Sequence, residues 1–260
     1  MFFSNTRTRI IVLCVLFFSI SIGKGIAQET KKLNARVISS FPSPGPSPQG
    51  LAWDGKNLWV VDDSTNRIYK IEPNTGKTLL SFEAPSRKPK GLTWDGNYLI
   101  LLENQKRKIY KIVSSGKALG SVIASNDLPL ISDIPSNKIS PWGLVWDGNY
   151  IYFNFEAGWS SQIVKYNIST QKVAKVNFTK GFPRGLAWDG EYLWNIIANS
   201  KQDSKYKAPA NLIKYDPISG KEIISYSIPL YFPAGLIFDG KKFWVADEKE
   251  GQVYEIVVEE

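Results

Sequence analysis

One short sequence occurs five times in this chain and limits what the chain can fold into. Each copy reads Gly-Leu-x-Trp-Asp-Gly, with Phe in place of Trp in the last copy. The first glycines of successive copies are 41, 52, 42 and 50 residues apart. Such a period is typical of folds that repeat one supersecondary unit. The copies are residues 50–55, 91–96, 143–148, 185–190 and 235–240.

Each copy continues with short runs that are typical of β-strands. In the first copy these runs are residues 58–61, 68–71 and 78–82. They are rich in β-branched and aromatic residues and are bounded by Gly, Asn, Asp or Pro. Asp-Gly between two apolar runs favours a tight hairpin, because glycine tolerates the positive φ of such a turn. No segment has a helical period, so we predict an all-β protein with four antiparallel strands per copy.

Four-stranded units of this length predict a β-propeller. We expect five blades, with six as the alternative. The last unit stops after its third strand, at residues 253–258, and residues 35–41 have the pattern of the missing outer strand. We therefore predict that residues 35–41 complete the C-terminal blade and close the ring. The Trp of each inner strand, such as Trp53, is expected to pack between neighbouring blades.

The first 27 residues have the pattern of a secretory signal peptide. Arg7 and Arg9 precede an apolar run over residues 10–23, and small residues lead to Ala27. The run is shorter than the roughly 20 residues of a membrane-spanning helix. Cleavage near Ala27 would leave one domain, residues 28–260, in a secreted or periplasmic protein with no membrane span. An uncleaved N-terminal anchor is the alternative.

The composition excludes several classes of function. There is no histidine, which excludes a Ser-His-Asp triad, a Cys-His pair and His-based metal sites. Cys14, in the leader, is the only cysteine, so the mature chain has no disulfide. The formal charge of +8 falls to +5 without the leader, and the basic residues are dispersed, which argues against nucleic-acid binding. We expect a monomer whose partner is a peptide, a carbohydrate or a protein.

The residues that precede the repeated glycines are the first candidates for a binding site. The loops that enter the inner strands and those that leave the second strands lie on one side of a propeller, which we call the loop face. The position before each glycine differs in every copy although its surroundings repeat, and proline fixes the loop around it. The alternative is that these are solvated loop residues without a function. The five residues are Gln49, Lys90, Trp142, Arg184 and Ala234.

Oxygen-bearing side chains near the ends of the second strands are the other candidates. Asp62, Glu103, Asn154 and Asp247 could together hold a hard cation such as Ca²⁺, while Asn154, Glu156 and Asp247 could contact a ligand. Asp62 and Glu103 are also the candidates for a catalytic acid or base. The alternative is that Asp and Asn cap the loops in which they lie.

Residues 59–71, Trp-Val-Val-Asp-Asp-Ser-Thr-Asn-Arg-Ile-Tyr-Lys-Ile, resemble the NHL- and YVTN-type propellers of secreted bacterial proteins. Those families are mostly binding modules, with some lyases and lactonases. The resemblance implies architecture more than activity. Our leading hypothesis is a secreted, non-catalytic propeller that binds its partner on the loop face. A calcium-dependent hydrolase similar to the lactonases is an alternative.

A second, weaker resemblance points to an enzyme. Residues 49–51 (Gln-Gly-Leu), 75–77 (Thr-Gly-Lys) and 142–144 (Trp-Gly-Leu) are similar to motifs of the plant-type glutaminyl-peptide cyclotransferases. Those are five-bladed propellers that convert an N-terminal Gln to pyroglutamate. The resemblance implies that Gln49 and Trp142 belong to a substrate pocket.

This chain differs from that family at the residue that is expected to act as the catalytic acid or base. In that family, the second strand of the first blade is followed by Glu-Ser-Thr-Gly. The aligned residues 60–63 here are Val-Val-Asp-Asp. An enzyme of this kind would need Asp62 as the base, with Glu103 nearby. Whether the protein is an enzyme is therefore left open by the sequence.

Overall fold

The computed structural model describes residues 32–131, 139–157, 160–179, 181–199 and 208–259. Every element within these ranges is a β-strand, as the sequence predicts. None of the described residues belongs to a helix long and apolar enough to cross a membrane. The expected signal peptide lies outside the described ranges.

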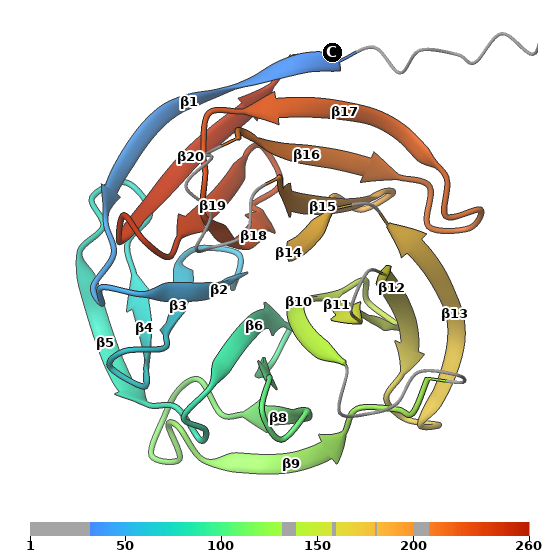
Figure 1. The fold of residues 1–260 in the computed structure, drawn as a ribbon. Coiled ribbons are helices and arrows are strands. Elements are labelled where there is room, and N and C mark those ends of the chain that lie inside the picture. Colours follow the sequence, from blue (N-terminus) through green and yellow to red (C-terminus); the bar gives the residue numbers. More distant parts are fainter. Residues whose placement is uncertain (1–31, 132–138, 158–159, 180, 200–207, 260) are drawn as a thin grey trace, which may run out of the picture.

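Three copies of the repeat fold into separate four-stranded antiparallel sheets arranged around an axis (Figure 1). The first sheet contains β2 (Pro48–Trp53), β3 (Leu58–Asp62), β4 (Arg67–Ile71) and β5 (Thr78–Glu83). The second contains β6 (Pro89–Trp94), β7 (Leu99–Glu103), β8 (Lys108–Ile112) and β9 (Val122–Asp127). The third contains β10 (Ser140–Trp146), β11 (Ile151–Ala157), β12 (Ser160–Asn167) and β13 (Lys172–Thr179).

The last two copies share one eight-stranded sheet, in the order β14-β15-β16-β17-β1-β20-β19-β18. The fourth copy contributes β14 (Phe182–Trp188), β15 (Leu193–Ala198), β16 (Ala210–Tyr215) and β17 (Glu222–Ile228). The fifth contributes β18 (Pro233–Phe238), β19 (Phe243–Asp247) and β20 (Gln252–Val258). The N-terminal β1 (Lys32–Pro42) lies between the two groups.

The N-terminal strand pairs on both of its edges. Residues Ala35–Pro42 pair antiparallel with β20, which is the predicted completion of the C-terminal unit. Residues Lys32–Asn34 pair in parallel with β17 of the fourth unit, which the sequence did not indicate. As Figure 1 shows, β1 therefore runs along the outside of both units and joins them.

The five inner strands lie against one another in a closed cycle around the axis. Strands β2, β6, β10, β14 and β18 each contact the next, and β18 contacts β2 again. The repeated glycines make this approach possible: a Cβ on Gly143 would lie 2.2 Å from the Arg184 carbonyl oxygen. A Cβ on Gly235 would lie 2.3 Å from the backbone carbonyl oxygen of Gln49, where the cycle closes.

A β-bulge in every inner strand displaces the residues next to these glycines. In the first unit the register with the second strand shifts between Pro48 and Leu51, and the other four units shift at the same place. Residues inside a bulge leave the regular ladder and point in a new direction. The bulge therefore presents the residue before each glycine on the loop face.

The hydrophobic core consists of clusters that lie between neighbouring sheets. One cluster joins Trp59 and Phe82 of the first sheet to Leu92 and Leu99 of the second. Trp53 is half-buried against the cluster that β2–β4 share with the fifth unit. The inner-strand aromatic residues thus pack between units, as predicted.

Candidate functional site

The inner strands leave little space at the axis. The space left at the axis is about 10 Å³ and is lined mainly by the repeated glycines and the leucines that follow them. That is too small for anything but a single water molecule. A ligand at the axis would therefore bind at the mouth of the channel and would not pass through it.

Four of the five residues that precede the glycines lie in contact at this mouth. The Lys90 ammonium donates a hydrogen bond to Gln49 Oε1 at 2.8 Å and lies 4.9 Å from the centre of the Trp142 ring. The Arg184 guanidinium lies 4.0 Å from the same ring. Both cation–ring distances are within the range of cation–π attraction. The bulges therefore assemble four predicted residues from four units into one group.

Glu248 closes this group, and the sequence reasoning missed it. The fifth residue of the set, Ala234, has no polar side chain, but Glu248 of the same unit accepts a hydrogen bond from Gln49 Nε2 at 3.0 Å. Glu248 directly follows Asp247, which was singled out instead. We call Gln49, Lys90, Trp142, Arg184 and Glu248 the mouth cluster.

Glu248 occupies a position that recurs in every unit and contacts the segment leading into the next unit. Strand register aligns it with Asp63, Asn104, Glu156 and Ala198. Where the position is polar, its contacts are Asp63–Lys90 at 3.8 Å, Asn104–Pro141 at 2.7 Å, Glu156–Arg184 at 3.6 Å and Glu248–Gln49 at 3.0 Å. Aligning the five units on the ends of their second strands, without regard to the charge of each side chain, would have revealed this recurring position.

Burial affects the pKa values of the two basic side chains, Lys90 and Arg184. Burial lowers the pKa of Lys90 below its ordinary value, while the carboxylates of Glu248 and Asp63 act in the opposite direction. Burial likewise lowers the pKa of Arg184, against the effects of Glu156 and Glu248. Desolvated charges interact more strongly than exposed ones, so this mixed group is suited to polar recognition.

Two polar atoms at the mouth have no hydrogen-bond partner among the described residues. They are the indole nitrogen of Trp142 and Oδ1 of Asp63, and both atoms are buried. Buried polar atoms are nearly always hydrogen-bonded in folded proteins. A donor and an acceptor are therefore available here to a ligand or to water.

Comparisons with known proteins identify the fold. Among solved structures, glutaminyl cyclase from Myxococcus xanthus is 12% identical, with a TM-score of 0.65 over 87% of this chain and 98% of that chain. A chain of the nidogen/laminin complex is 17% identical, with a TM-score of 0.52 over 78% and 73%. The fold is a β-propeller. No protein-family model and no curated protein matches the sequence.

Within the propeller, Asp62 is a loop cap. Its side chain is fully buried and accepts hydrogen bonds from the Ser47 amide at 2.6 Å, the Thr65 amide at 2.7 Å and the Thr65 hydroxyl at 2.9 Å. A carboxylate held in this way is not presented to a substrate at the mouth.

Glu103 and Asp247 have the same surroundings. Glu103 accepts hydrogen bonds from the amides of Gln105 at 2.9 Å and Lys106 at 2.6 Å. Asp247 accepts from the amides of Lys249 and Glu250, both at 3.0 Å. Burial raises the pKa of Asp247 above its ordinary value in spite of these bonds. All three acidic residues, Asp62, Glu103 and Asp247, cap the loops in which they lie, which was the alternative to a functional role.

Asn154 links the third unit to the fourth. Its Oδ1 accepts a hydrogen bond from the Gly143 amide at 2.6 Å, and its Nδ2 donates to the Arg184 carbonyl at 2.7 Å and to Asn195 Oδ1 at 3.0 Å. It does not occupy the position of Asp62, because Phe155 lies opposite Pro141 where Asp62 lies opposite Pro48. Its hydrogen-bonding capacity is used within the fold.

Each candidate metal ligand is hydrogen-bonded to other residues of the fold. Among the residues that the structure describes, no group of three or more His, Cys, Asp or Glu side chains could hold a metal ion. Calcium binding by Asp62, Glu103, Asn154 and Asp247 stays a prediction, and these contacts give it no support.

Proposed function

We propose that this protein is a secreted binding propeller that recognises a peptide or protein segment at the mouth of its channel, with a carbohydrate as the other class of ligand. The observation that carries the proposal is the mouth cluster. Positions that vary along an otherwise regular repeat are brought together at one point on the loop face.

The chemistry of the mouth cluster favours a peptide. Lys90 and Arg184 can bind carboxylate or carbonyl oxygen, and Glu248 can accept from an amide or an amine. The indole N–H of Trp142 and Oδ1 of Asp63 are a buried donor and a buried acceptor without a partner among the described residues. The half-buried Trp142 ring adds the apolar surface that ligand sites usually contain.

A binding experiment with defined probes tests this proposal. Capped tripeptides of neutral, acidic, basic and mixed charge, together with a neutral trisaccharide, would be titrated calorimetrically against the mature protein. We expect the mixed-charge peptide to bind best, and Trp142→Ala to weaken it about tenfold, which corresponds to about 1.4 kcal/mol.

Lys56→Gln, an exposed change on the opposite face, is the matched control and should leave binding unchanged. If the trisaccharide binds best and depends on Trp142, the ligand is a carbohydrate. If Trp142→Ala changes the binding of no probe, the mouth is not the binding site.

The second candidate is a glutaminyl-peptide cyclotransferase-like enzyme. Gln49 and Trp142, the two residues implied by that resemblance, both belong to the mouth cluster, and a glutaminyl cyclase has a similar fold. Its base would be Glu248, which contacts Gln49, because Asp62 is capped. A general base must be within hydrogen-bonding reach of the proton that it takes.

A fluorogenic Gln-peptide assay tests this alternative, with and without a chelator. Under this mechanism Glu248→Gln should remove turnover, whereas Asp62→Asn should keep most of it. Absence of turnover by the wild-type protein would reject the enzyme.

We also infer that the propeller has five blades. Each copy of the repeat would form one blade, and β1 would divide the eight-stranded sheet into a β14–β17 blade and a β18–β20 blade that it completes itself. The five clusters between neighbouring units and the closed cycle of inner strands support this count.

A further inference from the structure

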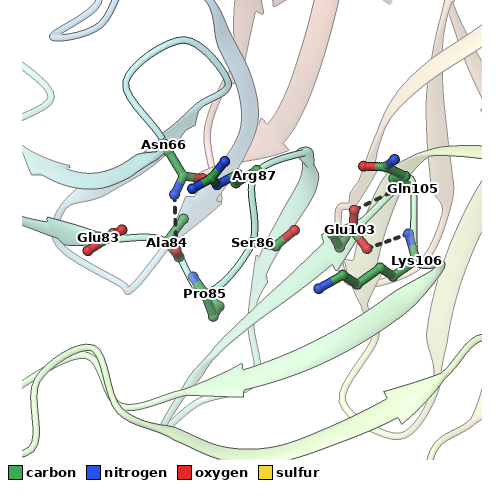
Figure 2. A pocket seen from close by; sticks show the side chains of 9 residues that line it. All are labelled: Asn66, Glu83, Ala84, Pro85, Ser86, Arg87, Glu103, Gln105 and Lys106. Carbon is green, nitrogen blue, oxygen red and sulfur yellow. Dashed lines mark hydrogen bonds between the residues drawn. The ribbon is translucent and has the colours of Figure 1, made fainter.

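A second cavity lies on the loop face, away from the channel mouth. It has a volume of about 520 Å³ and lies between the first two units (Figure 2). One side comes from the β3–β4 loop and the β5–β6 connection, and the other from the β7–β8 loop. No residue of the mouth cluster lines it.

Backbone contacts hold the walls of this cavity in place. The Ala84 amide donates to the Asn66 carbonyl at 2.9 Å, and the Asn104 amide donates to the Lys88 carbonyl at 3.0 Å. Figure 2 shows Glu103 turned onto its own loop, where it accepts from the amides of Gln105 and Lys106. The cavity is therefore formed before any ligand arrives, as most ligand sites are.

Two basic side chains of the cavity lining are available to a ligand. Arg87 and Lys106 are exposed in its lining, and neither forms an ion pair with any residue in the described ranges. Glu103 is almost fully buried, and its oxygens accept hydrogen bonds from backbone amides. It forms an ion pair with neither Arg87 nor Lys106. An arginine fork and an ammonium group together suit a carboxylate.

The rest of the lining suits hydroxyl groups. Ala84 and Pro85 are its only apolar residues, and none is aromatic. The exposed Glu83 carboxylate can accept hydrogen bonds from a ligand. Oδ1 of Asn66 is a buried acceptor without a partner among the described residues.

The chain packs tightly at the corresponding place between the fifth and first units. Register aligns Pro48 with Pro89, so that Gly45 corresponds to Ser86 and Pro46 to Arg87. Gly45 lies directly on Asp62, where an added Cβ would come within 2.3 Å of the carboxyl carbon. The open cavity with its two unpaired cations thus differs from its counterpart at this junction.

From these contacts we propose that the cavity between the first two units binds an acidic sugar. Arg87 and Lys106 hold the carboxylate, and Glu83 accepts hydrogen bonds from hydroxyl groups. The site is separate from the mouth cluster and does not depend on what the mouth binds.

Calorimetric titration of the mature protein with tri-galacturonate tests the proposal. We expect saturable binding that Arg87→Gln and Lys106→Gln each weaken about tenfold. Lys56→Gln removes one exposed positive charge on the opposite face and should have no effect. Trp142→Ala should also have no effect, which separates this site from the mouth.

Three further probes can overturn it. Maltotriose is a neutral sugar of the same length, and equally tight binding would remove the role of the carboxylate. Equal binding of inorganic sulfate or of a triglutamate peptide, with the same dependence on Arg87 and Lys106, would show an anion site that does not select sugars. Unchanged binding by both cavity variants would place the ligand elsewhere. Arg87, Lys106 and Lys56 are exposed and Trp142 is half-buried, and thermal melting should show that each variant is folded.

Discussion

At the residue scale, the repeated Asp of the Trp-Asp-Gly motif links the hairpin turn to the strands beside it. Asp54 accepts hydrogen bonds from the Lys56 and Asn57 amides at 3.0 and 2.7 Å. It also accepts from the Trp59 indole at 2.9 Å and pairs with Lys70 at 2.9 Å. We expect Asp54→Ala to lower the free energy of unfolding by about 2 kcal/mol, because a buried donor loses its acceptor. Urea melts compared with those of Lys56→Ala would measure this, and equal midpoints would contradict it.

The same carboxylate predicts a pH dependence. Burial alone would raise the pKa of Asp54, but hydrogen bonds from Lys70, Asn57, Trp59 and Lys56 lower that pKa below its ordinary value. A lowered folded-state pKa gives stability that is present above the unfolded value and lost as the pH falls through the folded one. We expect thermal midpoints to fall below about pH 4 and Asp54→Asn to reduce this fall. A pH profile identical to that of the wild type would contradict the assignment.

At the element scale, the glycines of the motif have two different roles. Gly143 lies within the inner strand β10, and an added Cβ would lie 2.2 Å from the next strand's backbone. Gly148 ends the motif in the turn, with φ of 99° and open space around it. We expect Gly143→Ala to destabilise the fold by more than about 3 kcal/mol, because backbone must move. Gly148→Ala should cost only about 1–2 kcal/mol of backbone strain. Chemical denaturation of both variants would show equal losses if crowding at the axis were unimportant.

At the scale of the whole molecule, β1 holds the two ends of the chain together. It pairs with β20 over eight residues from Ala35 to Pro42, counting the bulge, and also with β17. Deleting residues 28–45 should therefore abolish the single cooperative melt of the mature domain, because the β17 and β20 edges would both be exposed. Differential scanning calorimetry is the measurement. A sharp transition near the wild-type temperature would show that the units close without β1.

The sequence by itself determined the features that repeat. It predicted the all-β propeller and the pairing of residues 35–41 with the last unit, because both follow from local patterns and their period. It also named Gln49, Lys90, Trp142 and Arg184 as binding candidates on the loop face, since equivalent positions in a ring of units lie on the same side.

Only the tertiary structure decided which oxygen atoms are free and which are held. Asp62 and Glu103 look like ligands in the sequence, but backbone amides two to three residues away, and the amide of Ser47, occupy them. Glu248 looks like a loop residue, yet it contacts Gln49, 199 positions away. The open cavity between the first two units and the parallel pairing of β1 with β17 likewise arise between segments that are distant in sequence. Such contacts depend on how neighbouring units pack, and no local pattern encodes them.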